Sequence, residues 1–113
     1  SFLWQAGGTI DLGYGAGSWQ AICAGTTSVS LDDIHMVSSV WVPAPGTTYF
    51  NLDGAQECSL TTQPVFGNGG YRLSFEKSGI QPPAMEFITY NEEKSAVDLA
   101  AMESSIMNYY TIP

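Results

Sequence analysis

The fold is decided by residues 91–110, which read NEEKSAVDLAAMESSIMNYY. Apolar side chains recur there at three- and four-residue steps, and this spacing predicts one amphipathic helix. The apolar face consists of Ala96, Leu99, Met102, Ile106 and Tyr109 or Tyr110. Asn91 stands where an N-cap is expected. Glu92 and Glu93 fill the first turn, where the helix dipole favours negative charge.

The opposite face of this helix is expected to be an ordinary solvated surface. Its residues are Glu92, Lys94, Asp98, Glu103 and Ser104. The apolar face has to be buried against something, and almost everything before residue 91 has the pattern of strand or turn. We therefore predict an α+β domain, in which the C-terminal amphipathic helix packs on a mostly antiparallel β-sheet of about seven or eight short strands. The alternative is a β-sandwich with an edge helix.

The expected strands follow from alternation of apolar and polar residues and from breaks at glycine and proline. They lie at residues 2–6, 9–14, 18–24, 27–31, 34–42, 47–52, 56–62, 71–77 and 84–90. Asp53-Gly54 is the strongest hairpin signal in the chain. We expect one domain over residues 1–113, with strands between residues 2 and 90 and the helix at 91–110.

The composition is strongly acidic, with 3 Lys+Arg against 11 Asp+Glu and a formal net charge of −8 at pH 7. The cations are Arg72, Lys77 and Lys94. Phosphate groups are bound by clustered Lys and Arg, so nucleic acid and anionic membrane surfaces are not expected partners. The sequence has no run of 18 apolar residues, and we therefore predict no membrane span.

Cys23 and Cys58 are the two cysteines, and both fall in expected strands. We predict a disulfide between them, which would tie the N-terminal hairpin to the central one. In the chain-entropy model, closing such a loop contributes about 3–4 kcal/mol. Two buried free thiols, as in a cytosolic core, are the alternative. The disulfide and the low content of charged residues favour a secreted, extracellular protein.

His35 is the only histidine, so a site built from several histidines is excluded. Asp33 and His35 point to the same face of an expected strand and could work as an acid–base pair. No nucleophile-elbow pattern accompanies them. Asp32, Asp33 and Asp53 could converge on a calcium ion, although the twelve-residue calcium-loop pattern around Asp53 fails. No cofactor motif is present, and we expect no cofactor.

Aromatic residues make up 12% of the chain, and several lie on different expected strands. The candidates for a binding surface are Trp4, Trp19, Trp41, Tyr49 and Tyr71. An exposed subset would suit stacking on sugars or anchoring a protein partner. The alternative is that most of these side chains belong to the core.

The sequence contains no catalytic motif, no metal cluster and no basic patch. We therefore predict a small secreted, non-enzymatic protein that acts by binding another macromolecule, of the effector, toxin or inhibitor type. Its partner would be a protein or a glycan. A carbohydrate-binding, lectin-like module is the alternative, based on the aromatic residues. A small hydrolase or isomerase that uses His35 with Asp33 is the second alternative.

Overall fold

The computed structural model describes residues 2–4, 8–15, 19–30, 33–40, 42, 46–61, 75–77, 86, 88–90 and 92–113. Its elements are β1 (Phe2–Trp4), β2 (Ile10–Gly15), β3 (Trp19–Ala24), β4 (Val37–Val40), β5 (Thr48–Leu52), β6 (Ala55–Leu60), β7 (Phe75–Lys77) and α1 (Ala96–Tyr110). The strands form two sheets, ordered β3-β2-β1-β7 and β4-β5-β6. Neighbouring strands are antiparallel except for the parallel pair β1 and β7. The predicted α+β class is confirmed.

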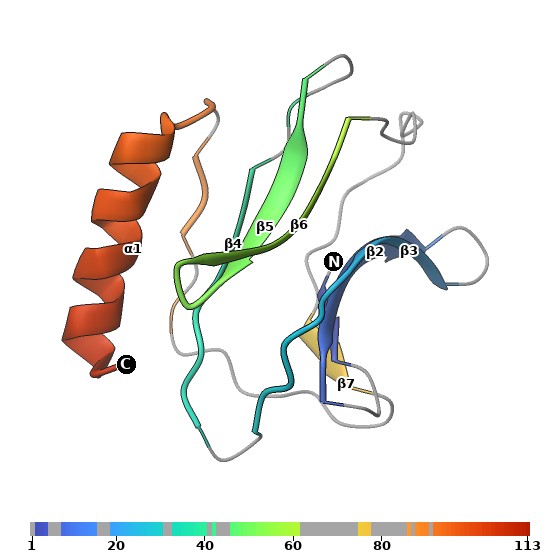
Figure 1. Ribbon diagram of the computed structural model, residues 1–113, viewed down its shortest axis with the longest axis horizontal. Coiled ribbons are helices and arrows are strands. Elements are labelled where there is room, and N and C mark those ends of the chain that lie inside the picture. Colours follow the sequence, from blue (N-terminus) through green and yellow to red (C-terminus); the bar gives the residue numbers. More distant parts are fainter. Residues whose placement is uncertain are drawn as a thin grey trace.

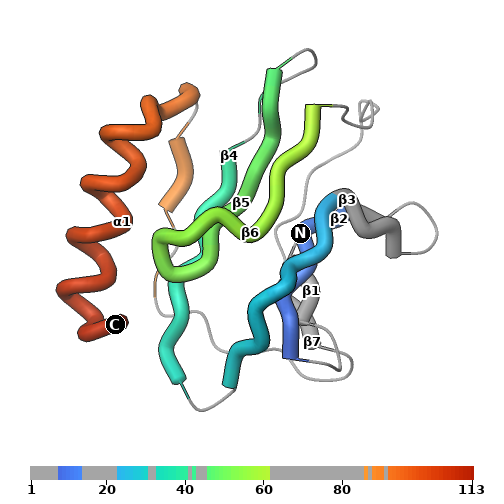
Figure 2. The backbone as a smooth tube through the Cα atoms, in the orientation of Figure 1, coloured from blue at the N-terminus to red at the C-terminus, as the bar shows by residue number. Residues whose placement is uncertain are grey.

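The sheet β4-β5-β6 lies in the middle of the molecule, with α1 on one side and the sheet that contains β2 and β3 on the other (Figure 1). The tube drawing shows the same arrangement, with the C-terminus at the end of the helix (Figure 2). Leu12 and Cys23 of one sheet pack against Phe50 of the other, and all three are buried. Val37, Cys58 and Leu60 are partly buried around them. The two sheets therefore share one small apolar core.

The predicted hairpin at Asp53-Gly54 is confirmed. These two residues connect β5 to β6, and Leu52 pairs with Ala55 across the turn. Asp53 has φ 48° and Gly54 has φ 78°. A two-residue turn of type I′ needs positive φ at both central positions, and Asp-Gly is among the residue pairs that tolerate it best. The local sequence therefore determines this turn.

Beyond the turn, β6 contains a β-bulge. Phe50 pairs with Cys58, but Asn51 pairs with Gln56, so Glu57 is an extra residue on its strand. A bulge interrupts the regular alternation of side chains. Because of this interruption, the consecutive side chains of Glu57 and Cys58 both reach the segment that contains β3 and the residues after it.

The helix begins later than predicted. Residues 92–95 are not helical, so the prediction that Asn91 is the N-cap is wrong, and Asn91 itself lies outside the described residues. Ser95 is the N-cap. Its hydroxyl oxygen accepts the amide of Asp98 at 3.1 Å and donates to the Asp98 carboxylate at 2.8 Å. The first bond satisfies one free amide of the first turn, and the second fixes the rotamer of the cap side chain.

The helix ends at Tyr110, as predicted. Thr111 has φ 56°, and the amide of Ile112 donates to the carbonyl of Met107 at 2.8 Å. A left-handed residue with such a returning hydrogen bond is a common C-cap. Within the described residues, no helix combines the length and the apolar character that crossing a membrane requires.

Within the described residues, fewer strands are present than the sequence predicts. Residues 27–30 are not a strand, because the amide of Thr27 donates to a carboxylate of β6 and the amide of Val29 donates to the carbonyl of Gly8. Backbone donors used in this way are lost to a strand ladder. Residues 88–90 also lie outside any strand, and β4 covers only Val37–Val40 of the predicted stretch 34–42.

Candidate functional site

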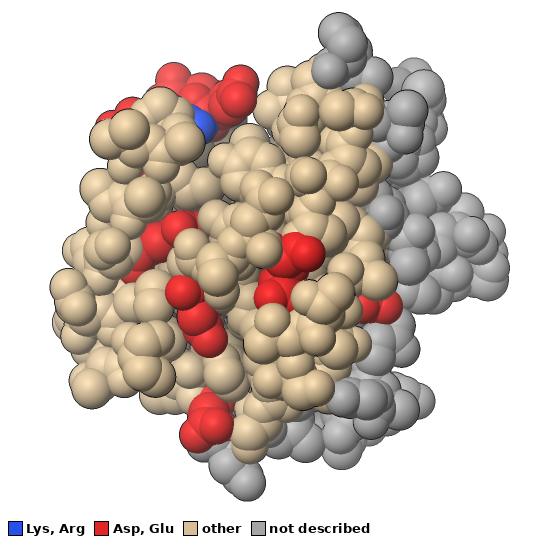
Figure 3. Space-filling model, in the orientation of Figure 1, with Lys and Arg blue, Asp and Glu red and all other residues tan. Residues whose placement is uncertain are grey.

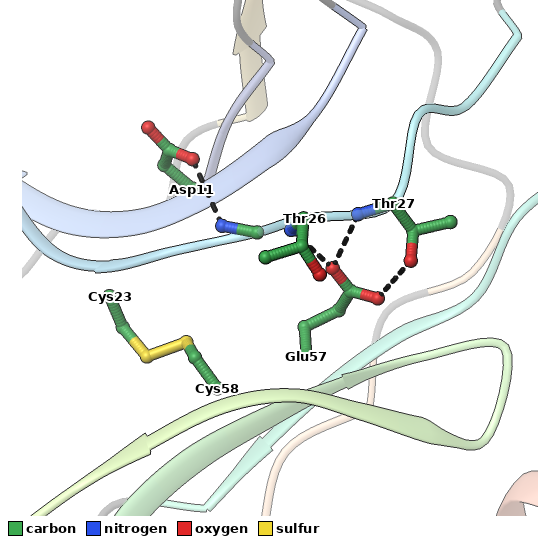
Figure 4. The surroundings of a disulfide bond; sticks show 7 residues. Asp11, Cys23, Thr26, Thr27, Glu57 and Cys58 are labelled. Carbon is green, nitrogen blue, oxygen red and sulfur yellow. Dashed lines mark hydrogen bonds between the residues drawn. A yellow bond between two sulfur atoms is a disulfide. The ribbon is translucent and has the colours of Figure 1, made fainter.

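The predicted disulfide is confirmed. Cys23 of β3 and Cys58 of β6 are bonded, with their Cα atoms 6.0 Å apart and a sequence separation of 35. The bond joins the two sheets at the place where β3 and β6 approach each other (Figure 4). The covalent tie therefore crosses the shared core.

A carboxylate reinforces the same junction. Glu57 Oε2 accepts the amides of Thr26 at 2.7 Å and Thr27 at 3.0 Å, and Oε1 accepts the Thr27 hydroxyl at 2.5 Å (Figure 4). The amide of Gly25, one residue earlier, donates to Asp11 at 3.1 Å. A Cβ atom at Gly25 would lie 2.2 Å from the carbonyl oxygen of Ile10, so only glycine fits. The carboxylates of Asp11 and Glu57 thus hold the segment directly after β3 in place.

Two opposing effects act on the pKa of Glu57. Partial burial raises the pKa of this carboxyl, but hydrogen bonds from Thr27 and Thr26 lower it more, and the result lies below the ordinary value. A lowered folded-state pKa stabilises the fold above the unfolded-state pKa, near 4.3, and this contribution is lost as the pH falls through the folded-state pKa. The hydrogen bonds of Glu57 to Thr26 and Thr27 should therefore stabilise the fold less at acidic pH.

We expect Glu57→Gln to lower the free energy of unfolding by about 1–2 kcal/mol at pH 7, since hydrogen bonds to a charged acceptor are lost. The difference from wild type should shrink as the pH falls below the unfolded-state pKa, about 4.3, and it should vanish below the lowered folded-state pKa, where the wild-type carboxyl is protonated too. Urea denaturation across this pH range measures it. Glu93→Gln corrects for the loss of one negative charge at an exposed position. A difference that stays constant down to pH 3 (about one unit below the usual Glu pKa) would contradict the interpretation.

His35 has an acidic partner, Asp53, that its neighbours in the sequence do not indicate. Its Nδ1 lies 2.7 Å from Asp53 Oδ2, and the other Asp53 oxygen accepts the amide of Met36 at 2.8 Å. The amide of Asp53 donates in turn to the carbonyl of Met36, also at 2.8 Å. These contacts join the start of β4 to the turn between β5 and β6. Asp33 is exposed, and its pairing with His35 stays a prediction.

The His35–Asp53 pair resembles an oriented general base in one respect only. A carboxylate on one ring nitrogen holds the ring in place, as a catalytic histidine requires. The other nitrogen, Nε2, is buried and has no hydrogen-bond partner among the described residues. A reacting atom would reach Nε2 only after the surroundings move. The pair is therefore better explained as a structural contact of the turn.

The predicted calcium ligands are not seen together. Asp32 lies outside the described residues, Asp33 is exposed, and Asp53 is occupied by His35 and Met36. Within the described part of the chain, no group of three or more His, Cys, Asp or Glu is placed to hold a metal ion. Calcium binding that involves Asp32 stays a prediction.

Most of the aromatic candidates lie outside the residues whose side chains the structure describes. The side chains of Trp4, Trp19, Trp41 and Tyr71 lie beyond the described part of the structure. Tyr49 is half-buried on β5. Burial, followed by the nearby carboxylates of Glu103 and Glu93, raises the pKa of the Tyr49 hydroxyl. Tyr49 is therefore a neutral phenol beside acidic groups, and a sugar-stacking role for the set stays a prediction.

The helix packs on the sheet through a buried acid. Glu103 is only 5% exposed, so the prediction that it lies on the solvated face is wrong. Its Oε1 accepts hydrogen bonds from the Ser38 hydroxyl and from Asn51 Nδ2, the latter at 2.8 Å. Ser38 and Asn51 are partners in the β4–β5 ladder and present neutral donors on one face of the sheet. A buried carboxylate needs such partners, because burying an unpaired charge is costly.

The spacing of the helix contained a signal for this placement. Leu99, Glu103, Ile106 and Tyr110 follow one another at steps of four, three and four, which places them on the same side. Leu99, Ile106 and Tyr110 are partly buried, as predicted, whereas Ala96 and Tyr109 are exposed. The apolar pattern located the buried face through Leu99, Ile106 and Tyr110, and through Met102, which is also partly buried, but it was wrong to include Ala96 and gave no reason to expect an acid.

With Glu103 turned inward, the outward side of α1 carries almost no charge. We call this surface the outer face; its exposed residues are Ala96, Val97, Asp98, Ala100, Ala101, Ser104, Ser105, Asn108 and Tyr109. Asp98 is its single charged residue. Val97 is 79% exposed and Tyr109 is 80% exposed. In the space-filling view, most of the helix side of the molecule is tan, the colour of residues other than Lys, Arg, Asp and Glu (Figure 3).

Exposed apolar side chains are concentrated in this region. Among the described residues, the exposed large hydrophobic side chains are Ile34, Ile88, Tyr90, Val97 and Tyr109. Four of these five belong to α1 or to the segment that leads into it. The hydroxyl of Tyr110 donates to Glu86 at 2.9 Å, which places the start of that segment against the last turn of the helix.

No protein-family model matches the chain, and comparisons with curated proteins and with solved structures also return no match. The function therefore has to be inferred from the residues themselves.

Proposed function

We propose that this chain is a small secreted, non-enzymatic protein that acts by binding another macromolecule, of the effector, toxin or inhibitor type, and that it does so through the outer face of α1. The observation that carries the proposal is the exposure of Val97 and Tyr109 on a helix face with one charged residue. Exposed helix faces normally carry charged and polar residues. Val97 lies in the first turn of α1 and Tyr109 in the last, about 18 Å apart along the helix axis, so a partner that covers the face would contact both ends. Tyrosine is common among residues that dominate binding energy.

The disulfide supports the extracellular part of the proposal. Disulfides persist in oxidising compartments and are rare in the cytosol. The bond between Cys23 and Cys58 crosses the shared core. A chain of 113 residues gains more from such a tie than a larger domain would.

The contacts beneath the helix support a rigid binding surface. Ser38 and Asn51 hold the inner side of α1 through Glu103. Ser95 and Thr111 cap its two ends. A surface that is already ordered loses little conformational entropy on binding, and more of the contact energy then appears as affinity.

The test is affinity capture from protein extracts with the wild type, one double variant and one single variant that serves as the control. Val97→Ser combined with Tyr109→Ser removes the apolar side chains of the outer face, and Ile34→Ser removes an exposed apolar side chain elsewhere. We expect the wild type and Ile34→Ser to retain the same protein, and the double variant to lose it by about ten-fold or more. Quantitative mass spectrometry measures retention.

Two results would contradict this function. One is retention of the same proteins by the double variant, which would show that the outer face is not the contact surface. The other is a set of specific hits on a glycan array without any protein partner, which would favour the carbohydrate-binding alternative. Circular dichroism of both variants establishes that the fold is unchanged, as expected for exposed positions.

A further inference from the structure

We infer that the partner of the outer face is a basic protein surface, with apolar side chains that cover Val97 in the first turn and Tyr109 in the last turn of α1, and with Lys or Arg side chains beside them. This inference rests on the proposed function, since it names the class of partner for the same surface. It follows from the charges that surround the outer face and from the way in which the two apolar side chains are held.

Acidic residues outnumber cations around the helix. Residues 86–113 contain the acids Glu86, Glu92, Glu93, Asp98 and Glu103 and a single cation, Lys94. All of these acids except Glu103 are exposed. On the face seen in Figure 3, blue appears at one place, near the N-terminal end of α1, whereas red appears at several. The potential around the outer face is therefore negative.

The charge of Lys94 is already compensated. Its Nζ lies 2.6 Å from Glu92 Oε1 and 4.6 Å from the centre of the Tyr90 ring. An ion pair and a cation–π contact both direct this ammonium group toward its own chain. Lys94 is thus poorly placed to attract an acidic partner, and Glu93 and Asp98 remain beside it.

The C-terminal end of α1 adds to the negative potential. The last turn of a helix carries partial negative charge, which basic side chains usually offset. No basic residue lies in the last turn of α1. Acidic residues surround the first end of the outer face, and the helix dipole is negative at the other. A cationic partner is therefore attracted at both ends of the outer face.

Tyr109 is held in position for contact. Its ring packs edge-to-face on that of Tyr110, with the centroids 4.9 Å apart, and the Tyr110 hydroxyl is bonded to Glu86. The residues between Val97 and Tyr109 on the outer face are mainly alanine and serine, which lose little side-chain entropy when covered. The outer face therefore favours apolar contact, while the acids beside it favour positive charge.

A second copy of the chain does not fit this surface. The chain carries a net charge of −8, and two outer faces would bring exposed acids of the same sign together. Like charges placed together across an interface oppose association. A basic partner removes this repulsion, because each acid then faces a charge of opposite sign.

The experiment uses synthetic helical peptides as probes, with fluorescence anisotropy as the readout. The first peptide has leucine on one face and lysine on the other. The second has glutamate in place of lysine, and the third has serine in place of leucine. We expect only the leucine–lysine peptide to bind. Its affinity should fall about ten-fold or more when NaCl is raised from about 0.05 to 0.5 M, because salt screens the attraction.

Variants separate the contribution of the apolar side chains of the outer face from that of the charges beside it. Val97→Ser with Tyr109→Ser should weaken binding about ten-fold, mainly through faster dissociation. Glu93→Lys should slow association several-fold, because charges near an interface act chiefly on the association rate. Asp33→Lys makes the same change at an exposed acid before β4 and should leave association closer to the wild-type rate.

Several outcomes would overturn the inference. Equal binding of the glutamate peptide would exclude a basic partner, and equal binding of the serine peptide would show unspecific charge attraction. A dimer of the chain in sedimentation experiments, disrupted by Val97→Ser with Tyr109→Ser, would identify a second copy as the occupant. If a protein is captured through the outer face but the leucine–lysine peptide does not bind, the partner class is wrong and the proposed function stands.

Discussion

Replacing both Cys23 and Cys58 with serine should lower the free energy of unfolding by about 4 kcal/mol. The two cysteines are 35 positions apart, and closing a loop of this length removes that much chain entropy from the unfolded state. Domains of this kind are stable by only about 5–15 kcal/mol, so the loss is a large share of the total. The free energy is measured by urea denaturation of the oxidised wild type and of the double variant.

The loss of stability in this double variant should appear first in one part of the molecule. The disulfide joins β3 to β6, and the contacts of Glu57 to Thr26 and Thr27 lie directly beside it. Hydrogen exchange should therefore increase in residues 19–30 before it increases in α1. Reduction of the wild-type protein serves as the control and should reproduce the behaviour of the double variant. Exchange that increases equally in α1 and in residues 19–30 would contradict this order of events.

Glu103→Ala should lower the free energy of unfolding by about 3 kcal/mol, because it leaves two donors without an acceptor and creates a cavity under the helix. Those donors are the Ser38 hydroxyl and the Asn51 side-chain amide. Glu103→Gln keeps an oxygen acceptor and nearly the same shape. We expect it to cost less than about 1.5 kcal/mol. Denaturation of the two variants measures the difference.

Ser104→Ala provides the matched control, since it changes an exposed residue next to Glu103. It should alter stability by no more than about 0.5 kcal/mol. Equal losses for Glu103→Ala and Glu103→Gln would show that the negative charge matters and that the acceptor oxygen does not. If Glu103→Ala behaves like Ser104→Ala, the inward position of this side chain is refuted.

Some features of the fold could be predicted because short stretches of sequence determine them. The Asp53-Gly54 turn follows from the positive φ that type I′ turns require. The end of α1 and the α+β class follow from the period of the apolar residues. The start of the helix was missed, although Ser95 and Asp98 form a capping signal, because Asn91 with two following acids formed a competing signal earlier in the chain.

For the disulfide, the sequence and the tertiary structure each determine a part. A chain with two cysteines allows a single intramolecular bridge, so the sequence alone named Cys23 and Cys58 as its ends. The approach of the two Cα atoms to 6.0 Å depends on how β3 and β6 meet across the core. The sequence could therefore identify the pair, whereas only the tertiary structure shows that the bond joins two sheets.

Only the tertiary structure decided which partner each buried or clamped acid has. Glu57 contacts residues 30 and 31 positions away, Glu103 contacts Asn51 at a separation of 52, and His35 meets Asp53 at a separation of 18. Hydrophobic periodicity shows which face of an element is covered, but it carries no information about the donors on the covering element. The sequence determined the helix, the turn and the cysteine pair. The packing of α1 on β4 and β5 turned Glu103 inward and left Val97 and Tyr109 exposed on the outer face.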